Sequence, residues 1–200
     1  MAGCDNLIKM NIERNCADPL AMGYEKKGIL INREHIDFGA VVFDPENNNI
    51  ITSLPLKEDK FGFWVYQHGT KPFNGTNKSV EVGELGNSVT SNVHIVLPDH
   101  SPALIDGVID PLLNGEFVFI SFNKHKGLVN SKGASAFEVF GFFQGLSISE
   151  GGRDAYAEDT GGGWAITLTE SKAPKAGLFL FDTDYTTTET MINSLVEEKA

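Results

Sequence analysis

The chain of 200 residues has little cysteine and no long hydrophobic run. Cys4 and Cys16 are its only cysteines and do not form a CxxC pair, so they cannot build a structural zinc site. Two isolated cysteines are typical of free thiols in a reducing compartment, and a disulfide that ties the N-terminal segment is the alternative. No apolar stretch approaches membrane-spanning length, and charged residues interrupt the first apolar ones, unlike in a signal peptide. We therefore expect a protein made in a cytoplasm, without membrane contact.

Positive charge is also scarce. The chain carries 16 Lys and Arg against 27 Asp and Glu, which gives a formal net charge of −11. No run rich in Lys or Arg occurs, so tight binding of nucleic acid through its phosphates is not expected. An acidic surface repels polyanions instead. DNA could therefore pass over such a surface without specific binding.

Signature motifs of catalysis are missing as well. The sequence contains no GxSxG elbow, no HExxH pair and no phosphate-binding loop. The histidines do not pair at metal-binding spacing; they are His35, His68, His94, His100 and His125. A metal site would require tertiary convergence of separate residues. We expect no cofactor, no metal and no enzymatic activity. The remaining enzymatic alternative is a hydrolase with a carboxylate pair between Glu150 and Asp159.

What the sequence does contain is a series of short β-branched and aromatic runs separated by turn residues, a pattern typical of a sandwich or barrel. Strands are predicted at Gly28–Asn32, Ala40–Phe43, Ile50–Leu54, Phe61–Tyr66, Val89–Leu97, Glu116–Phe122, Ala136–Phe143 and Gly163–Glu170, and Leu178–Phe181 is a short apolar segment. The predicted fold is mainly β: a β-sandwich or barrel with one flanking helix and a C-terminal helix. We divide the chain into an extended N-terminal arm (1–24), the sandwich domain (25–183) and the helix (184–200).

The flanking helix is predicted to begin at Ser101. Serine is a good N-cap and Pro102 suits the first helical position. Apolar residues then form one stripe: Leu104, Ile105, Val108, Ile109, Leu112 and Leu113. Gly115 fits the C-terminal cap, whereas Pro111 should kink or loosen the last turn. A second amphipathic helix is predicted at Thr188–Glu198.

The two phenylalanine-rich runs, Glu116–Phe122 and Ala136–Phe143, are apolar on both faces. Such a strand is either buried on both sides or meets another subunit. The surplus of apolar surface indicates a subunit interface. Its candidate residues are Phe117, Phe119, Phe122 and Phe140. The second run is expected to continue through Gln144–Glu150, past bends or bulges at Gly141 and Gly145.

A glycine-rich acidic loop, Glu150–Gly163 (EGGRDAYAEDTGGG), precedes the last long strand. Glu150, Arg153, Asp154, Glu158 and Asp159 are its charged residues. No oriented polar wall is evident around these carboxylates, so acid–base chemistry is less expected than a solvated loop or a subunit contact. We predict that this loop is an inter-subunit or inter-ring arm that becomes ordered only on assembly.

The order of several motifs resembles the tail-tube and tail-ring (connector) virion structural proteins of tailed bacteriophages, especially those of phages and prophages of gut Bacteroidetes, including crAss-like phages. The resemblance spans nearly the whole chain and is more specific in its second half. The motifs that carry it are Met1–Cys4, Asn15–Leu20, Ile31-Asn32, Leu113–Val118 (LNGEFV), Phe137–Gly141 (FEVFG), Gly145-Leu146, Arg153-Asp154, Glu158–Gly162 (EDTGG) and Ala165–Leu168 (AITL). The sequence departs from the pattern at Trp164, beside a triple glycine, and at Pro111, which leaves the subtype open.

The resemblance implies a β-sandwich subunit that forms a closed ring, sixfold or twelvefold, around a DNA channel in the virion, with other tail or connector proteins as neighbours. A ring uses heterologous contacts, so each subunit needs two different surfaces. An acidic channel wall would let DNA slide. The alternative function is a β-sandwich binding or adhesion module on a virion or cell surface, with Trp64 and Tyr66 as its aromatic platform.

Overall fold

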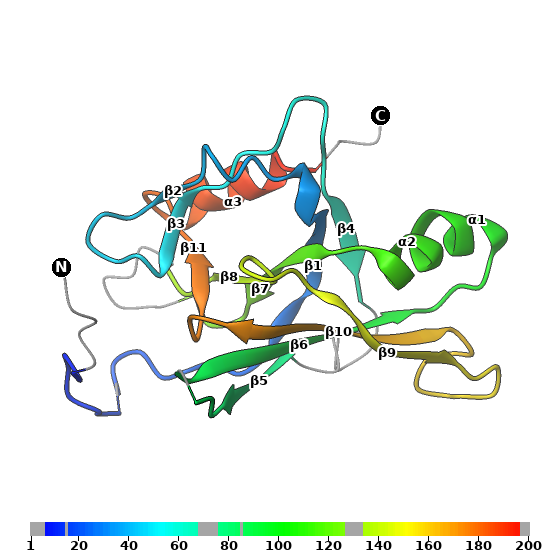
Figure 1. Cartoon of the computed structure of the whole chain (residues 1–200), viewed down its shortest axis with the longest axis horizontal. Helices are drawn as coiled ribbons and strands as arrows, with labels where there is room; N and C mark the ends of the chain where they lie inside the picture. The colour runs from blue at the N-terminus through cyan, green and yellow to red at the C-terminus, as the bar shows by residue number, and fades with distance from the viewer. Residues whose placement is uncertain (1–6, 15, 68–75, 85, 127–133, 197–200) are drawn as a thin grey trace.

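The computed structural model describes residues 7–14, 16–67, 76–84, 86–126 and 134–196. Two sheets carry the fold (Figure 1). The larger has the order β2-β3-β11-β8-β7-β1-β4, and the smaller has the order β5-β6-β10-β9. The strands are β1 (Tyr24–Asn32), β2 (Val42–Phe43), β3 (Ile50–Ser53), β4 (Phe63–Tyr66), β5 (Thr76–Glu81), β6 (Ser88–Leu97), β7 (Phe117–Asn123), β8 (Phe137–Phe140), β9 (Ser147–Arg153), β10 (Trp164–Ala173) and β11 (Leu178–Leu180). The prediction of a mainly β fold with few helices is confirmed.

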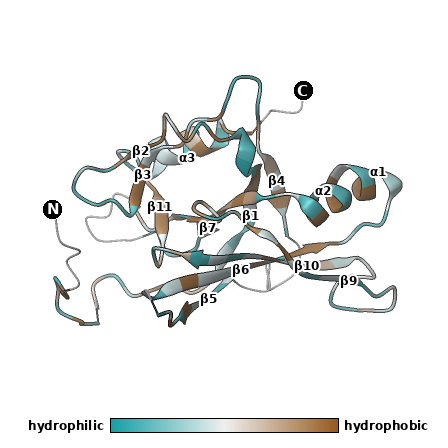
Figure 2. Cartoon of the chain, viewed as in Figure 1, coloured by the Kyte–Doolittle hydropathy of each residue, from teal (hydrophilic) through white to brown (hydrophobic). Residues whose placement is uncertain are grey.

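Alternation of apolar and polar residues places the two sheets face to face. In β6, Val93 and Ile95 are buried while Asn92 and His94 are partly exposed, and β10 alternates in the same way. These strands need only one buried face, because solvent covers the other. Figure 2 shows the corresponding mixture of hydrophobic and hydrophilic colour along β6 and β10.

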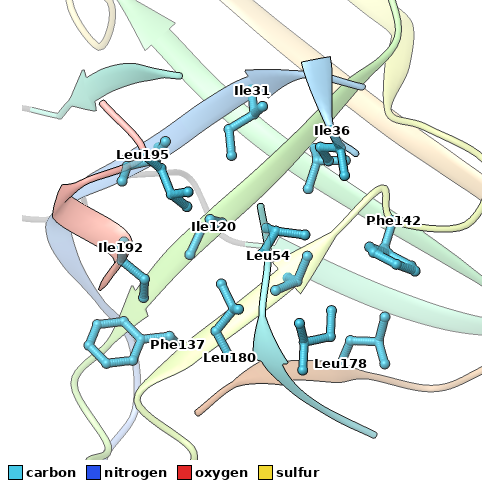
Figure 3. Close-up of a cluster of buried hydrophobic side chains, with 14 of the residues drawn as sticks. Ile31, Ile36, Leu54, Ile120, Phe137, Phe142, Leu178, Leu180, Ile192 and Leu195 are labelled. Carbon is cyan, nitrogen blue, oxygen red and sulfur yellow. The ribbon is translucent and has the colours of Figure 1, made fainter. Parts of the chain in front are cut away.

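The larger sheet is buried on both faces. One apolar cluster lies between the two sheets and is formed by Leu30, Val93, Ile95, Ile109, Leu112, Phe117, Phe119, Phe140, Leu146, Ile166 and Leu168. A second cluster lies on the opposite face (Figure 3), where α3 (Tyr185–Asn193) and the following turn contribute Ile192, Leu195 and Val196. The central strand β7 therefore sits between two cores and has six consecutive buried residues.

The four phenylalanines predicted for a subunit interface lie inside the chain. Phe117, Phe119 and Phe140 pack between the sheets, and Phe122 packs in the cluster beneath α3. All four are at least 96% buried. The interface prediction is wrong for these side chains, because a second layer of this same chain covers each face of the strand.

The flanking helix begins as predicted and then changes its geometry. The Ser101 hydroxyl accepts a hydrogen bond from Leu104 N at 3.2 Å and caps α1 (Pro102–Leu104). A π-helical turn follows at Ile105–Ile109, before α2 (Asp110–Asn114). Pro111 has no amide hydrogen for a bond to the preceding turn. A π-turn just before it agrees with the predicted loosening, but the distortion lies N-terminal to the proline rather than in the last turn.

The second phenylalanine-rich run does not continue as one strand. β8 ends at Phe140, and a turn at residues 141–145 leads into β9, which belongs to the other sheet. Gly141 and Gly145 have φ angles of 81° and 85°, in the left-handed region that favours glycine. The predicted bends are therefore a crossover between the two sheets.

The buried carboxylate of Glu170 holds this crossover. Its oxygens accept hydrogen bonds from Gly141 N at 2.8 Å, Phe143 N at 2.9 Å and Gln144 N at 2.9 Å. Glu170 is 4% exposed, and the three amides compensate for burying its charge. Glu170 thus ties β10 of the small sheet to the segment that leaves the large sheet.

We expect Glu170→Gln to lower the free energy of unfolding by about 2 kcal/mol, because the amide loses the charge and directs an N–H group at a backbone donor. Urea denaturation followed by tryptophan fluorescence measures the change. Lys172→Gln is the matched control, since Lys172 is exposed on the same strand, and it should change stability by less than about 0.5 kcal/mol. Equal stability of the two variants would contradict this role for Glu170.

The ends of the chain differ from the core. Residues 7–14 and 16–23 contain no helix or strand, and Cys16 is exposed, while Cys4 lies outside the described residues.

The C-terminal helix α3 starts three residues before the predicted Thr188, because the Asp184 carboxylate caps it by accepting from Thr187 N at 2.8 Å. This bond lowers the pKa of the Asp184 carboxyl. The last predicted helical residues lie partly outside the described residues. No helix in the described part of the chain has both the length and the apolar character needed to cross a membrane.

Candidate functional site

The outer face of the small sheet is the candidate functional surface. A chain of hydrogen-bonded polar side chains crosses all four strands there. Asn92 Nδ2 donates to Asn77 Oδ1 at 2.6 Å, Thr169 Oγ1 donates to Asn92 Oδ1 at 2.7 Å, and the Ser149 and Thr169 hydroxyls lie 2.6 Å apart. These uncharged groups run from edge strand β5 to edge strand β9, so the face is polar without a positive charge in this row.

His94 lies on the same face. Its Nδ1 is 2.9 Å from Thr167 Oγ1 on the neighbouring strand. The sequence analysis assigned His94 no functional role, because no other histidine lies at metal-binding spacing from it. The alternation within Val89–Leu97 could have placed it, because Asn92, His94 and Val96 share one side of a strand whose other side is apolar.

The acidic loop is the hairpin between β9 and β10. Glu150 and Arg153 belong to β9, where they pair with Thr167 and Trp164 of β10. The prediction that the whole segment is a loop is wrong for residues 150–153, because two glycines do not prevent strand pairing when the neighbouring strand supplies hydrogen bonds. Residues 154–163 form the turn, in which Gly161 and Gly162 have positive φ angles of 62° and 78°.

The turn folds back toward the outer face of the sheet and leaves a cavity of about 550 Å³. Its walls come from β6, β9, β10 and the turn itself. They include His94, Glu150, Asp154, Asp159, Thr160 and Thr167. Thr160 is buried and its hydroxyl has no hydrogen-bond partner. Asp154 accepts from Tyr156 N at 2.9 Å and thereby shapes the turn.

The structure brings together some of the predicted charged residues. Glu150, Arg153, Asp154 and Asp159 line the cavity, whereas Glu158 does not. All five are exposed to solvent. Water surrounds these side chains, whereas sites of acid–base catalysis exclude water around the reacting groups. Among the described residues, no group of three or more His, Cys, Asp or Glu is arranged to hold a metal ion. The geometry suits binding or contact better than proton transfer.

Both edges of the small sheet are open in the part of the chain that the structure describes: no strand pairs with the outer side of β5 or of β9. The three strand pairs of the sheet are all antiparallel. Strands β5 and β9 therefore run in opposite directions. A copy related by rotation about an axis along the strands would place its β5 antiparallel to β9 of the first copy, and the sheet would continue without a break in its pattern.

Comparison of the chain with protein-family models, with curated proteins and with solved structures finds no match. Its function is therefore inferred from the motifs of the sequence and from the geometry of the small sheet.

Proposed function

We propose that the chain is a ring-forming subunit of a bacteriophage tail or head-to-tail connector, a non-enzymatic virion protein that encloses the DNA channel. One observation carries this proposal: the small sheet has two open edges of opposite direction, and a row of uncharged polar side chains crosses the outer face between them. Edge strands of a monomer are an aggregation hazard. Closing the sheet into a ring removes both edges. The resemblance to tail-tube and tail-ring proteins agrees with such an assembly.

The dimensions of a ring built in this way are suitable for a channel. Six copies would contribute roughly 24 strands at about 4.8 Å spacing, which gives a wall at least about 35 Å across. Twelve copies would double this width. A duplex could pass along Asn92, Thr167 and Thr169 without ion pairs, and the acidic residues Glu81 and Glu150 on the same face would repel its phosphates. Other tail or connector proteins would bind above and below.

Imaging of the purified full-length chain tests the proposal. We expect closed rings or short tubes by negative-stain microscopy, and a mass by native mass spectrometry that is a whole multiple of the subunit. Hydrogen exchange then locates the contact. Amides of β5 and β9 should become protected in the assembled form compared with dilute subunit, because they gain strand partners.

The inner strands β6 and β10 serve as the internal control, since each already has two partners and should not change. A chain that stays monomeric at every concentration would exclude the ring. Rings in which β5 and β9 exchange as fast as in the monomer would exclude these edges as the contact.

The binding-module alternative has one observation in its favour. The Trp64 and Tyr66 rings stack, with centroids 5.9 Å apart and an interplanar angle of 26°. However, Trp64 also packs on Phe122 and beneath the Lys27 ammonium, so mainly Tyr66 presents its ring to solvent. A monodisperse monomer that binds glycans, with binding lost in Tyr66→Ala, would favour this function over the ring.

A further inference from the structure

The N-terminal arm contains a strand pattern that lies outside both sheets. Residues Leu7–Glu13 (LIKMNIE) alternate between apolar and polar side chains, the period of a half-buried strand. The apolar positions Ile8, Met10 and Ile12 are 81%, 79% and 91% exposed. An alternating segment of this kind is stable only when its apolar face is covered. A sheet edge that carries apolar side chains would cover it.

Strand β4 provides such an edge. In the part of the chain that the structure describes, it ends the larger sheet and its strand partner is β1. Just before it, Gly62 N donates to Leu195 O at 2.7 Å, so the unpaired edge lies along residues 63–66. Its side chains include exposed aromatic residues: Phe63 is 60% and Tyr66 is 58% exposed. Gln67 N donates to Lys26 O at 2.9 Å across this pair. In an antiparallel pair the amides alternate in direction, so the backbone groups of Trp64 and Tyr66 point to the open edge.

The edges of the small sheet are a poorer match for the arm. Strand β9 offers serine and glycine residues, and β5 carries Asn77, Lys78 and Ser79 at its centre. An apolar arm buries more apolar surface beside the aromatic side chains of β4 than beside these polar strands.

The arm of a given copy lies on the side of β1 away from its own β4. Ala21 N donates to His125 Nδ1 at 3.3 Å, and the Asp18 carboxylate lies 3.7 Å from His125 Nε2. His125 follows β7, and β7 lies on the side of β1 opposite to β4. Figure 1 shows the arm leading away from β4. From Ala21 to Ile12 an extended chain covers about 30 Å, far enough to reach a neighbouring molecule.

We propose that residues 7–13 of one copy add a strand to the open edge of β4 in a second copy. The contact rests on the self-assembly proposed above, but it uses a surface separate from β5 and β9. Strand addition would satisfy the outward backbone groups of β4. Ile8, Met10 and Ile12 share one face of the added strand and would cover the face of β4 on which Trp64 and Tyr66 stack. The contact would bury the three exposed apolar side chains of that face, Ile8, Met10 and Ile12.

Cross-linking between two full-length chains tests the contact directly. In a background with Cys4→Ser and Cys16→Ser, one chain carries Met10→Cys and a differently tagged chain carries Tyr66→Cys. We expect a disulfide between the two tags under mild oxidation, and none when Leu113→Cys on α2 replaces Tyr66→Cys. A link that forms only when both cysteines are in one chain, or no link at all, would overturn the proposal.

A second measurement uses the two faces of the arm. Replacement of Ile8, Met10 and Ile12 by serine should raise the concentration at which half of the chains are assembled at least tenfold. The control replaces Lys9 and Asn11 by serine and should leave that concentration unchanged. Equal behaviour of both variants would contradict the proposal. If the wild-type chain forms rings and the arm variants form them equally well, the arm contact alone is refuted. If the arms cross-link but no rings form, the ring alone is refuted.

Discussion

Replacing Phe119 by alanine is expected to lower the free energy of unfolding by about 4 kcal/mol, because the ring is buried between the sheets and its removal leaves a cavity. Phe119 is 1% exposed. Its ring lies on Gly28, where an added Cβ would come within 2.4 Å of Phe119 Cζ. The neighbouring strand therefore offers no side chain to fill the space. Chemical denaturation of dilute, unassembled protein measures the loss.

Tyr156→Ala is the control for this experiment. Tyr156 is 95% exposed at the tip of the β9–β10 hairpin, so its removal should change stability by less than about 0.5 kcal/mol. The pair of variants separates a core residue from an exposed one. A Phe119→Ala variant that folds with unchanged stability but fails to assemble would show that the phenylalanine serves a subunit contact rather than the core between the sheets.

Replacing Gly141 by alanine is expected to cost about 4 kcal/mol, from two causes that add. The φ angle of 81° is strained for any residue with a Cβ. In addition, that Cβ would lie 2.4 Å from Phe117 O and 2.9 Å from Leu146 N, which are backbone atoms on both sides of the crossover. Relief of this clash requires separation of β7 from the start of β9. Thermal and urea denaturation both report the change.

Gly107→Ala is the matched glycine control. Gly107 lies in the π-helical turn and has no positive φ, and a Cβ added there would meet no atom within 4 Å. Alanine favours helical backbone over glycine, so this variant should be equally or slightly more stable, by about 0.5 kcal/mol. A similar loss in both variants would mean that glycine content in general, rather than the crossover at Gly141, limits stability.

The sequence pattern located most of the strands because their side chains alternate or are uniformly apolar. It missed β5, since Thr76–Glu81 is mostly polar and has no buried residue. Only pairing with β6 makes this segment a strand. The same reason explains the first residues of the acidic hairpin. Gly151 and Gly152 have low strand propensity, and the neighbouring strand β10 supplies the hydrogen bonds that the local sequence does not predict.

The candidate surface could be predicted only in part. Composition indicated an acidic, non-nucleic-acid-binding chain, and the hairpin residues Glu150, Arg153, Asp154 and Asp159 do share one cavity. The other residues that line this cavity could not be predicted from the sequence. His94 and Thr167 reach it from other strands, and His94 is far from the hairpin in the sequence. The role of Glu158 and of the whole hairpin as a subunit contact stays a prediction for the assembled protein.

The sequence by itself determined the class of the fold, the cap of the first helix and the scarcity of positive charge, because each depends on residue type and local spacing. Only the tertiary structure decided what covers each apolar face. A strand such as β7, apolar on both sides, fits a subunit interface and a buried central strand equally well. The placement of α3 on one side and of the small sheet on the other made it a core strand. That choice depends on contacts between residues distant in the chain, which local periodicity does not encode.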